Sequence, residues 1–322
     1  MAATQVTVPA ALHGERVDRV VATLTGMARS EVAAHVASGA VALNGRPVRA
    51  RALRVSKGDR LEIAVSERAS PAGLEPDPSV EVAVVHADEH VVVVDKAGGV
   101  VVHPGSGRSR GTLVQGLLAR FPDLAGVSGG EGQRPGIVHR LDKGTSGLMV
   151  VARSADAYRS LVEQLRSRTV DRRYLCLVWG ELQERAGMVD APVGRSGSDR
   201  TRMAVSAGGR PARTRFHVLE GLSEAGVSLL ECRLETGRTH QVRVHLSSIG
   251  HPVVGDDRYG GGRPGLAAPR PFLHAHQLSF RHPGTGEKVS YSSALPPDLS
   301  AVLAEARRRA TERPSWPSPG PG

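Results

Sequence analysis

The sequence predicts an α+β chain of two parts, a small unit of helices and strands followed by a larger unit rich in strands. Hydrophobic residues make up 40% of the 322 residues, which is enough for a folded core. At roughly 100–200 residues per domain, this length accommodates two ordinary domains. Residues 67–79 are rich in Pro, Gly and charge, as linkers often are. The hydrophobic pattern indicates short helices and a small sheet before this stretch and many strands after it.

The first unit spans residues 15–66. Apolar residues at helical spacing predict a helix from Val17 to Leu24, and a second helical run lies between Ser30 and Gly39. Asn44-Gly45 is the strongest short signal for a β-hairpin. The alternation from Leu61 to Val65 predicts a strand. We therefore expect two short helices and a small sheet in this unit.

The larger unit, residues 80–300, is expected to be mainly strands. Apolar and alternating runs predict strands within residues 80–88, 90–96, 99–103, 147–153, 172–182, 212–222, 227–237, 275–281 and 287–291. Helical patterns predict helices within residues 112–121, 154–168 and 239–250. Residues 301–322 carry three consecutive arginines and a Pro-, Ser- and Gly-rich end, a composition that predicts a basic, disordered tail.

The charge of the chain favours a polyanionic partner. The net charge is +10, and only four of the 42 basic residues are lysines, so arginine dominates. The arginine fork suits phosphates and base edges, although a compositional bias of the genome would produce the same excess. Two cysteines exclude a disulfide scaffold and a four-cysteine zinc site. No apolar run approaches the ~18 residues of a membrane span, and no leader pattern opens the chain, so we expect a cytoplasmic protein.

Common enzyme motifs are absent from the sequence. There is no GxxxxGK[ST] loop of the NTPase type and no HExxH zinc motif. Gly144-Thr145-Ser146-Gly147 begins like the nucleophile elbow of a hydrolase, but Leu148 stands where the final glycine must be. We therefore expect neither an NTPase, nor a serine hydrolase using Ser146, nor a resident metal.

Two segments concentrate polar residues. In residues 136–153, polar side chains around Asp142 separate two apolar runs, which is a usual place for a site. Neighbouring cations favour the ionised form of Asp142. In residues 234–246, Arg238 precedes a predicted helix, where an anion binds favourably. A carboxylate that only caps a turn and a solvated basic face remain the structural alternatives.

At these two segments the chain resembles the RluA/RluD family of RNA pseudouridine synthases. The matching stretches are HRLDKGTSGL and LETGRTHQVRVHL, together with RRYL (172–175), GDDRYG (255–260) and LHA (273–275) through His282-Pro283. They occur in the order of the family between residues 80 and 295. Residues 15–65 resemble the small RNA-binding domain first described in ribosomal protein S-four, through ERVDRVVATL, ARSEVAAHVASGAVALNG and KGDRLEI.

The resemblance implies a catalytic domain with a mixed, mostly antiparallel sheet and a central cleft. It implies that Asp142 is the essential catalytic aspartate and that Tyr174 packs on the flipped base. Arg238 corresponds to the arginine that pairs with the aspartate, and Val242 to an aliphatic residue of the pocket. Gly144 departs from the family, many members of which have an acidic residue there.

Two further residues of the first motif are expected to bind the substrate. Arg140 is similar to the residue that enters the helix stack as the target nucleotide leaves it, and His139 precedes it in the same motif. The family converts uridine in RNA to pseudouridine, so the target base must be flipped out of its stack. An ionised aspartate can stabilise positive charge at carbon 1′, attack it, or remove a sugar proton, and the sequence leaves these routes open. The isomerisation involves no redox change or group donor, so we expect no cofactor.

The expected substrate is large-subunit (23S) ribosomal RNA. In the first unit, we expect Arg29, Arg46 and Arg49 to contact phosphates. Residues 195–215 carry six arginines and one acid, so they form a candidate RNA-facing loop, although a solvated loop explains them almost as well. The alternatives are a transfer RNA pseudouridine synthase and a non-catalytic RNA-binding factor of ribosome assembly. We expect a monomer.

Overall fold

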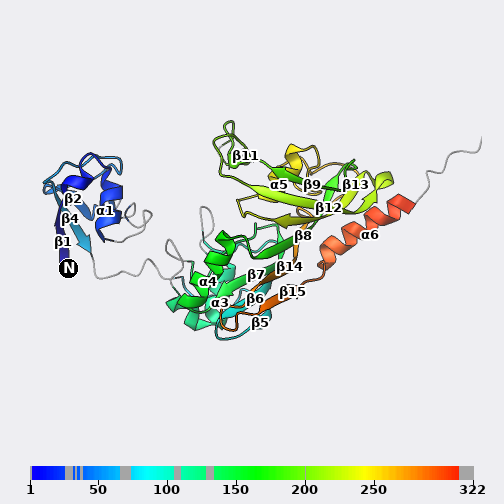
Figure 1. The fold of residues 1–322 in the computed structure, drawn as a ribbon, viewed down its shortest axis with the longest axis horizontal. Helices are drawn as coiled ribbons and strands as arrows, with labels where there is room; N and C mark the ends of the chain where they lie inside the picture. Colours follow the sequence, from blue (N-terminus) through cyan, green and yellow to red (C-terminus); the bar gives the residue numbers. More distant parts are fainter. Residues whose placement is uncertain are drawn as a thin grey trace, which may run out of the picture. The chain divides into compact units, whose positions relative to one another are not determined.

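The computed structural model describes residues 2–25, 32, 35–36, 39–65, 74–104, 110–127, 134–199 and 201–311 (Figure 1). It divides into two compact units, which are described separately. The smaller comprises residues 1–76 with 128–135, and the larger comprises residues 77–127 with 136–322. The boundary at residues 76 and 77 falls inside the stretch that the sequence analysis treats as a linker.

The smaller unit contains a four-stranded antiparallel sheet in the order β1-β4-β2-β3. Its elements are β1 (Ala2–Thr7), the short 3-10 helix η1 (Ala10–Leu12), α1 (Val17–Thr25), β2 (Val41–Leu43), β3 (Arg46–Pro47) and β4 (Arg60–Val65). The predicted hairpin turn is present, with positive φ values of 52° at Asn44 and 76° at Gly45. Apolar residues of α1 and the sheet form the core with Val32 and Val36, which the sequence analysis places in a second helix. The sequence analysis does not anticipate β1.

A mixed sheet of nine strands forms the larger unit. Its order is β5-β6-β7-β14-β8-β13-β12-β9, with β15 paired to β14. The strands are β5 (Ala83–Ala87), β6 (Val91–Lys96), β7 (Ser146–Ala152), β8 (Asp171–Trp179), β9 (Ala186–Asp190), β12 (Arg213–Leu222), β13 (Val227–Leu234), β14 (Leu273–Arg281) and β15 (Lys288–Ser292). All pairings are antiparallel except that of β7 with β14. The mixed, mostly antiparallel sheet that the resemblance implies is therefore confirmed.

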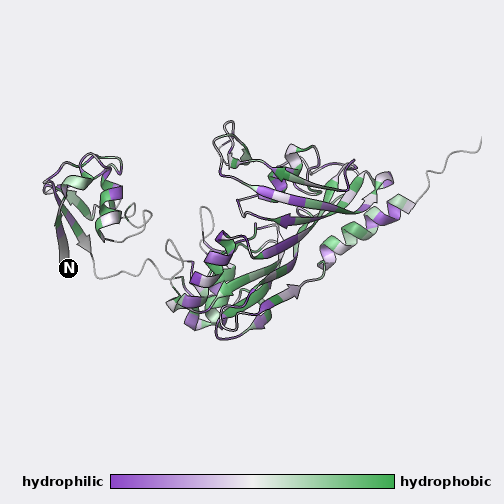
Figure 2. Cartoon of the chain, in the orientation of Figure 1, coloured by the Kyte–Doolittle hydropathy of each residue, from purple (hydrophilic) through white to green (hydrophobic). Residues whose placement is uncertain are grey.

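The middle of this sheet is buried on both faces. Every residue of β7 is buried, as are five of the six residues of β6. Figure 2 shows the same region as predominantly hydrophobic. Continuous apolar runs such as VVVV are typical of strands covered on both sides. The helix α4 (Ala155–Arg166) packs Ala157 and Leu161 into the core beside β7 and β14.

The remaining elements surround the sheet. They are α3 (Leu113–Arg120), the 3-10 helices η2 (Pro122–Gly126) and η3 (Ser223–Ala225), α5 (Gln241–Ser248), α6 (Pro297–Thr311) and the separate hairpin β10 (Val193–Arg195) and β11 (Met203–Val205). The strand expected within residues 99–103 is wrong, since only an isolated bridge from Val101 to Thr112 forms there. Among the helices that the structure describes, none combines the length and apolarity needed to cross a bilayer.

The boundary expected at residue 300 is also wrong. The helix α6 continues to Thr311 and buries Leu303 and Ala306, so it belongs to the larger unit. The arginine run 307–309 contributed to the prediction of a disordered tail. In the structure, two of these arginines are paired with carboxylates: Arg307 with Glu220, and Arg309 with Glu305 of the same helix. Residues 312–322 of the expected tail lie outside the described residues.

A glycine allows the single parallel pairing of the sheet. Gly147 in β7 has a φ of 112°, and a Cβ placed there would lie 2.3 Å from the carbonyl oxygen of Ala275 in β14. Gly250 has a φ of 88° but nothing within 4 Å of such a Cβ. A side chain at residue 147 would therefore suffer both backbone strain and a clash with a neighbouring strand.

We expect Gly147→Ala to lower the free energy of unfolding by at least about 2 kcal/mol, because strain and overlap add. Gly250→Ala, the matched control, should cost only the strain of a positive φ, on the order of 1 kcal/mol. Urea titrations of the two variants and the wild type measure the difference. Equal destabilisation by both variants would show that the close contact of residue 147 with β14 adds no cost beyond the backbone strain.

Candidate active site

Asp142 lies in the loop that enters β7. The loop is held at both ends, since Ile137 bridges Val151 and the Thr145 N–H donates to the Asp142 carbonyl at 3.1 Å. Ser146 then begins β7, whose first residues pair with β14. The polar loop set between apolar runs in the sequence is therefore anchored to the middle of the large sheet. Asp142 itself is partly exposed, so its carboxylate is accessible.

The arginine that contacts Asp142 is Arg243, not Arg238. The Arg243 Nη1 donates to Asp142 Oδ2 at 3.1 Å. Arg238 instead donates from Nε to the carbonyl of Pro211 at 3.1 Å. The implied pairing of Arg238 is wrong because α5 begins at Gln241. Arg238 therefore belongs to the turn before the helix, whereas Arg243 sits in its first turn and faces the aspartate.

A second carboxylate fixes the Arg243 guanidinium. Asp256 accepts two hydrogen bonds from it, from Nε at 2.6 Å and from Nη2 at 2.8 Å. The Tyr259 ring lies under the guanidinium, with its centroid 5.0 Å from the central carbon. Burial alone would lower the pKa of Arg243, but the hydrogen bonds and charges of Asp256 and Asp142 raise it above its ordinary value. The guanidinium is therefore a fixed cation beneath Asp142.

His240 lies nearest to the other carboxylate oxygen of Asp142, Oδ1. Its Nδ1 is 2.8 Å from the Tyr259 hydroxyl, and its Nε2 is 3.9 Å from Asp142 Oδ1. Burial lowers the pKa of His240, while the charge of Asp142 opposes that shift. His240 has a left-handed backbone, with a φ of 57°, at the point where the chain turns into α5. Of the two Asp142 oxygens, Oδ2 is bonded to Arg243 and Oδ1 is beyond hydrogen-bonding distance of His240.

Tyr174 is buried in β8, close enough to Asp142 to feel its charge. Burial raises the pKa of Tyr174 to about 12, although the charge of the nearby Arg172 acts in the opposite direction. The phenol is thus protonated at neutral pH and presents both an aromatic face and a hydroxyl group. The packing of Tyr174 on the flipped base, which the resemblance implies, stays a prediction.

Lys96 is hydrogen-bonded to the backbone of the loop that carries Asp142. The residue is 1% exposed, and its ammonium donates to the carbonyls of Ala97 at 2.8 Å, Val100 at 2.9 Å and Lys143 at 3.4 Å. Burial and the positive charge of Arg270 lower the pKa of Lys96 to about 7. The sequence analysis assigned no role to this lysine. The sequence feature that could have indicated a role for Lys96 is its place at the end of an apolar strand.

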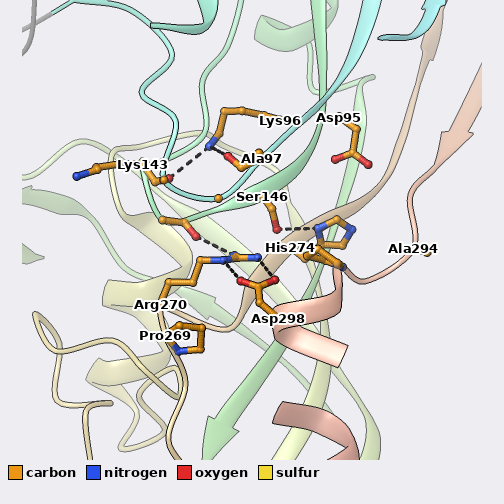
Figure 3. A pocket seen from close by; sticks show the side chains of 14 residues that line it. Asp95, Lys96, Ala97, Lys143, Ser146, Pro269, Arg270, His274, Ala294 and Asp298 are labelled. Carbon is orange, nitrogen blue, oxygen red and sulfur yellow. Dashed lines mark hydrogen bonds and ion pairs between the residues drawn. The ribbon is translucent and has the colours of Figure 1, made fainter. Parts of the chain in front are cut away.

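A cavity of about 690 Å³ lies beside this support (Figure 3). Arg270 crosses it, pairing with Asp298 of α6 at 2.6 Å and donating from Nη1 to the Gly144 carbonyl at 2.9 Å. A Cβ on Gly144 would lie 3.1 Å from Pro271, so the departure from the family pattern at residue 144 coincides with tight packing. Ser146 bonds His274 at 2.9 Å and is thus an internal polar contact of two buried residues.

The remaining residues of the first motif have different surroundings. His139 accepts the Val150 N–H at Nε2, at 3.1 Å, and burial lowers its pKa to about 3. It therefore ties the loop to β7, which the sequence analysis did not anticipate. Arg140 is exposed, with its Nη1 3.4 Å from His103 Nε2. Val242 is buried in the first turn of α5. Substrate contacts of these three residues stay predictions.

Of the three arginines of the smaller unit that are expected to contact RNA, the structure describes two. Arg46 and Arg49 are both exposed. Arg29 lies outside the described residues. Phosphate contacts of these arginines also stay predictions.

One cluster has the composition of a metal site. The nitrogens of His86 and His282 lie 2.8 and 2.9 Å from Asp88 Oδ2. His282 Nδ1, however, accepts backbone N–H groups of Gly284 at 3.3 Å and Thr285 at 3.2 Å, so the proton of the neutral ring is on Nε2. That proton is donated to Asp88, whereas a metal ligand needs a free lone pair. The cluster is a hydrogen-bonded link between β5 and the turn after β14.

The lowered pKa of Lys96 predicts a pH-dependent stability. Below pH 7 the lysine is protonated in both folded and unfolded chains, so its burial cost is constant. Between about 7 and 10.5 the unfolded chain alone holds the proton, so the free energy of unfolding should rise with pH. Relative to Lys96→Met, the wild type should gain up to about 1.4 kcal/mol per pH unit in this window.

Urea titrations between pH 6 and 10, followed by tryptophan fluorescence, measure this difference. Lys143→Met is the matched control, because Lys143 is an exposed lysine of the same loop. Its difference from the wild type at each pH is the reference against which that of Lys96→Met is compared. A flat difference for Lys96→Met would mean that the lysine keeps its ordinary titration in the folded protein.

Comparison with known proteins assigns the family. The family model described as RNA pseudouridylate synthase matches residues 90–248, which include Asp142, Tyr174 and Arg243. A Bacillus subtilis protein named "Uncharacterized RNA pseudouridine synthase YlyB" is 42% identical, over 91% of this chain and 95% of its own length. The "Ribosomal large subunit pseudouridine synthase D" of Nitrosomonas europaea is 40% identical, over 94% of this chain and 88% of its own.

A solved structure agrees with the sequence relatives. That of "Human RNA Pseudouridylate Synthase Domain Containing 1" matches with a TM-score of 0.55 and 32% identity. The match covers 73% of this chain and 97% of the human one. The motifs, the mixed sheet and these relatives agree, and the chain belongs to the RluA/RluD family of RNA pseudouridine synthases.

Proposed function

We propose that this protein isomerises specific uridines of large-subunit ribosomal RNA to pseudouridine, with Asp142 acting at the sugar. The observation that carries the proposal is the partly exposed Asp142 carboxylate held by Arg243 beside the buried Tyr174. The substrate follows from relatives such as that of Nitrosomonas europaea, whose names specify the large ribosomal subunit.

In the proposed mechanism, Arg243 keeps Asp142 oriented through its hydrogen bond. Its hydrogen bond occupies Oδ2, so Oδ1 is the oxygen that faces carbon 1′ of the target nucleotide. The bond between carbon 1′ and the base nitrogen breaks, the base turns, and a new bond forms from carbon 1′ to carbon 5. The proton on carbon 5 leaves and the freed nitrogen gains one, so the reaction is a balanced isomerisation that requires no cofactor.

Tyr174 and Arg140 serve the step that exposes the base. Flipping a nucleotide out of its stack costs a few kcal/mol. Stacking on the Tyr174 ring and insertion of the exposed Arg140 into the vacated position offset that cost. Burial raises the pKa of the Tyr174 phenol to about 12, and in this proposal its hydroxyl group also takes part in the transfer of the carbon 5 proton. In this proposal, Val242 lines the pocket that receives the flipped base, and His139 positions the loop that contains Arg140.

The smaller unit acts, in this proposal, as an RNA-binding domain. Its exposed arginines Arg46 and Arg49 contact phosphates, which adds affinity without base specificity. We propose that the protein works in the cytoplasm as a monomer. A non-catalytic RNA-binding factor is disfavoured, since it has no need of a carboxylate held among cations. A transfer RNA substrate is disfavoured by the names of the relatives.

We expect Asp142→Asn to reduce tritium release from ribosomal RNA labelled at uridine carbon 5 by at least about 100-fold, because the amide cannot replace the charge. The RNA must come from cells that lack this protein. Asp156→Asn, which alters an exposed carboxylate of α4, is the matched control and should keep full release. Equal release by Asp142→Asn and the wild type would remove Asp142 from the mechanism. Release from transfer RNA alone would change the substrate.

We expect Arg46→Glu and Arg49→Glu to weaken RNA binding and its dependence on salt. Each lost phosphate contact should reduce the slope of log Kd against log salt concentration by about 0.7–0.9. The rate at saturating RNA should not change. Arg19→Glu is the control in the same unit, because Arg19 is already paired with Glu15. A slope unchanged from that of the control would rule out phosphate contacts by Arg46 and Arg49.

A further inference from the structure

Four arginines from separate segments converge at one end of β8. Arg168 follows α4, Arg172 is the second residue of β8, Arg210 precedes β12, and Arg238 lies in the turn before α5. We refer to these four residues as the arginine cluster. Residue 237 in that turn must be small, because a Cβ there would lie 2.9 Å from Arg172 Nη1.

The side chains of the cluster influence one another. The Arg238 Nε donates a hydrogen bond at 3.1 Å to the carbonyl of Pro211, the residue that follows Arg210. Burial and the positive charges of Arg210 and Arg168 lower the pKa of Arg238. Burial lowers the pKa of Arg172, while the charges of Tyr174 and Asp171 act in the opposite direction. The fold therefore holds Arg238 near the like charges of Arg168 and Arg210 at an energetic cost.

The folded chain neutralises this charge only in part, since Asp171 acts on Arg172 by its charge without a hydrogen bond to it among the described residues. Arg172 is 7% exposed, and its Nε has no hydrogen-bond partner among the described residues. Within the same part of the chain, neither Arg172, Arg210 nor Arg238 forms an ion pair. Arg168 is 3.9 Å from Glu235, a carboxylate already bonded to Arg215 at 2.6 Å.

The turn that carries Arg238 is held in place. The Gln241 side chain accepts the Arg238 N–H at 3.0 Å and the Thr236 hydroxyl at 2.7 Å. Its amide nitrogen donates to the Arg213 carbonyl and the Thr214 hydroxyl, both at 3.0 Å. The backbone position of Arg238 is therefore fixed before any ligand arrives, which lowers the entropic cost of binding.

The cluster begins next to the proposed active site. Arg172 and Tyr174 are two residues apart on β8, so their side chains lie on the same face of the strand. Arg238 is two residues before His240, whose Nε2 is 3.9 Å from Asp142. A ligand of the cluster therefore lies beside the nucleotide that reaches Asp142.

We propose that Arg168, Arg172, Arg210 and Arg238 bind backbone phosphates of the RNA strand adjacent to the target uridine. This proposal rests on the proposed function for its substrate. Phosphates supply the missing negative charge, and the arginine fork matches their oxygens with paired hydrogen bonds. An isolated guanidinium that is buried without a partner is costly, so RNA binding relieves a penalty present in the free protein. Arg238 thus has a role distinct from the pairing with Asp142 that the resemblance implied.

The test measures RNA affinity in the Asp142→Asn background, which separates binding from turnover. A fluorescein-labelled single-stranded oligouridine RNA is titrated at several salt concentrations. We expect Arg210→Gln and Arg238→Gln each to reduce the slope of log Kd against log salt concentration by about 0.7, and the double variant by about 1.4. Arg159→Gln, which removes an exposed, paired arginine of α4, should leave the slope unchanged.

Arg172 is tested by two substitutions, because it is buried. Arg172→Lys keeps the charge and should retain the slope, whereas Arg172→Gln should lower it. Circular dichroism establishes whether Arg172→Gln is folded. If it is not folded, Arg210→Gln and Arg238→Gln test the proposal without it. Slopes of Arg210→Gln and Arg238→Gln equal to that of Arg159→Gln would overturn the proposal.

Tritium release by the wild type gives an independent readout. Reduced slopes without release from any RNA would support the phosphate site and contradict the isomerase. Release with unchanged slopes would support the isomerase and contradict the phosphate site. The two proposals can therefore fail separately.

Discussion

The Arg243 guanidinium, held between two carboxylates, is the interaction on which the rest of the site depends. Asp256 takes two of its hydrogen bonds and Asp142 takes a third. Removing one partner of a buried pair typically costs about 3–5 kcal/mol, because the other charge is left without compensation. The arrangement therefore joins three segments, the loop before β7, the helix α5 and the turn after it. It also leaves Oδ1 of Asp142 without a hydrogen bond among the described residues, 3.9 Å from His240 Nε2.

The Asp142 loop is fixed from its other side by backbone contacts. Lys96 and Arg270 donate to the carbonyls of Lys143 and Gly144, and both are themselves held by surrounding residues. Gly147 then allows β7 to pair closely with β14. Catalytic groups act efficiently when neighbouring contacts hold them within a fraction of an ångström of the productive geometry. Here, much of the support comes from hydrogen bonds to backbone carbonyls of the loop.

Charge is distributed for a polyanionic substrate. Many surface arginines are paired with nearby carboxylates, as in α4 and α6, and these pairs contribute little to stability. The arginine cluster is different, since three of its members form no ion pair with the described residues and one is buried. Cations without a carboxylate partner are suited to the RNA phosphates that we propose as their ligands, whereas paired cations are already neutralised. The excess of arginine is therefore informative only when the position of each side chain is known.

The sequence by itself determined the order of the local elements and the identity of several site residues. Apolar runs predicted β6 and β7, Asn44-Gly45 predicted the first hairpin, and the motif around Asp142 indicated the family, because these signals depend on neighbouring residues alone. Tertiary structure decided the rest. It selected Arg243 over Arg238, since the partner depends on where α5 begins and which side faces a loop 101 residues away in the chain. It also extended α6 through an arginine-rich segment, because that helix is stabilised by packing and ion pairs with distant residues, which a local pattern does not contain.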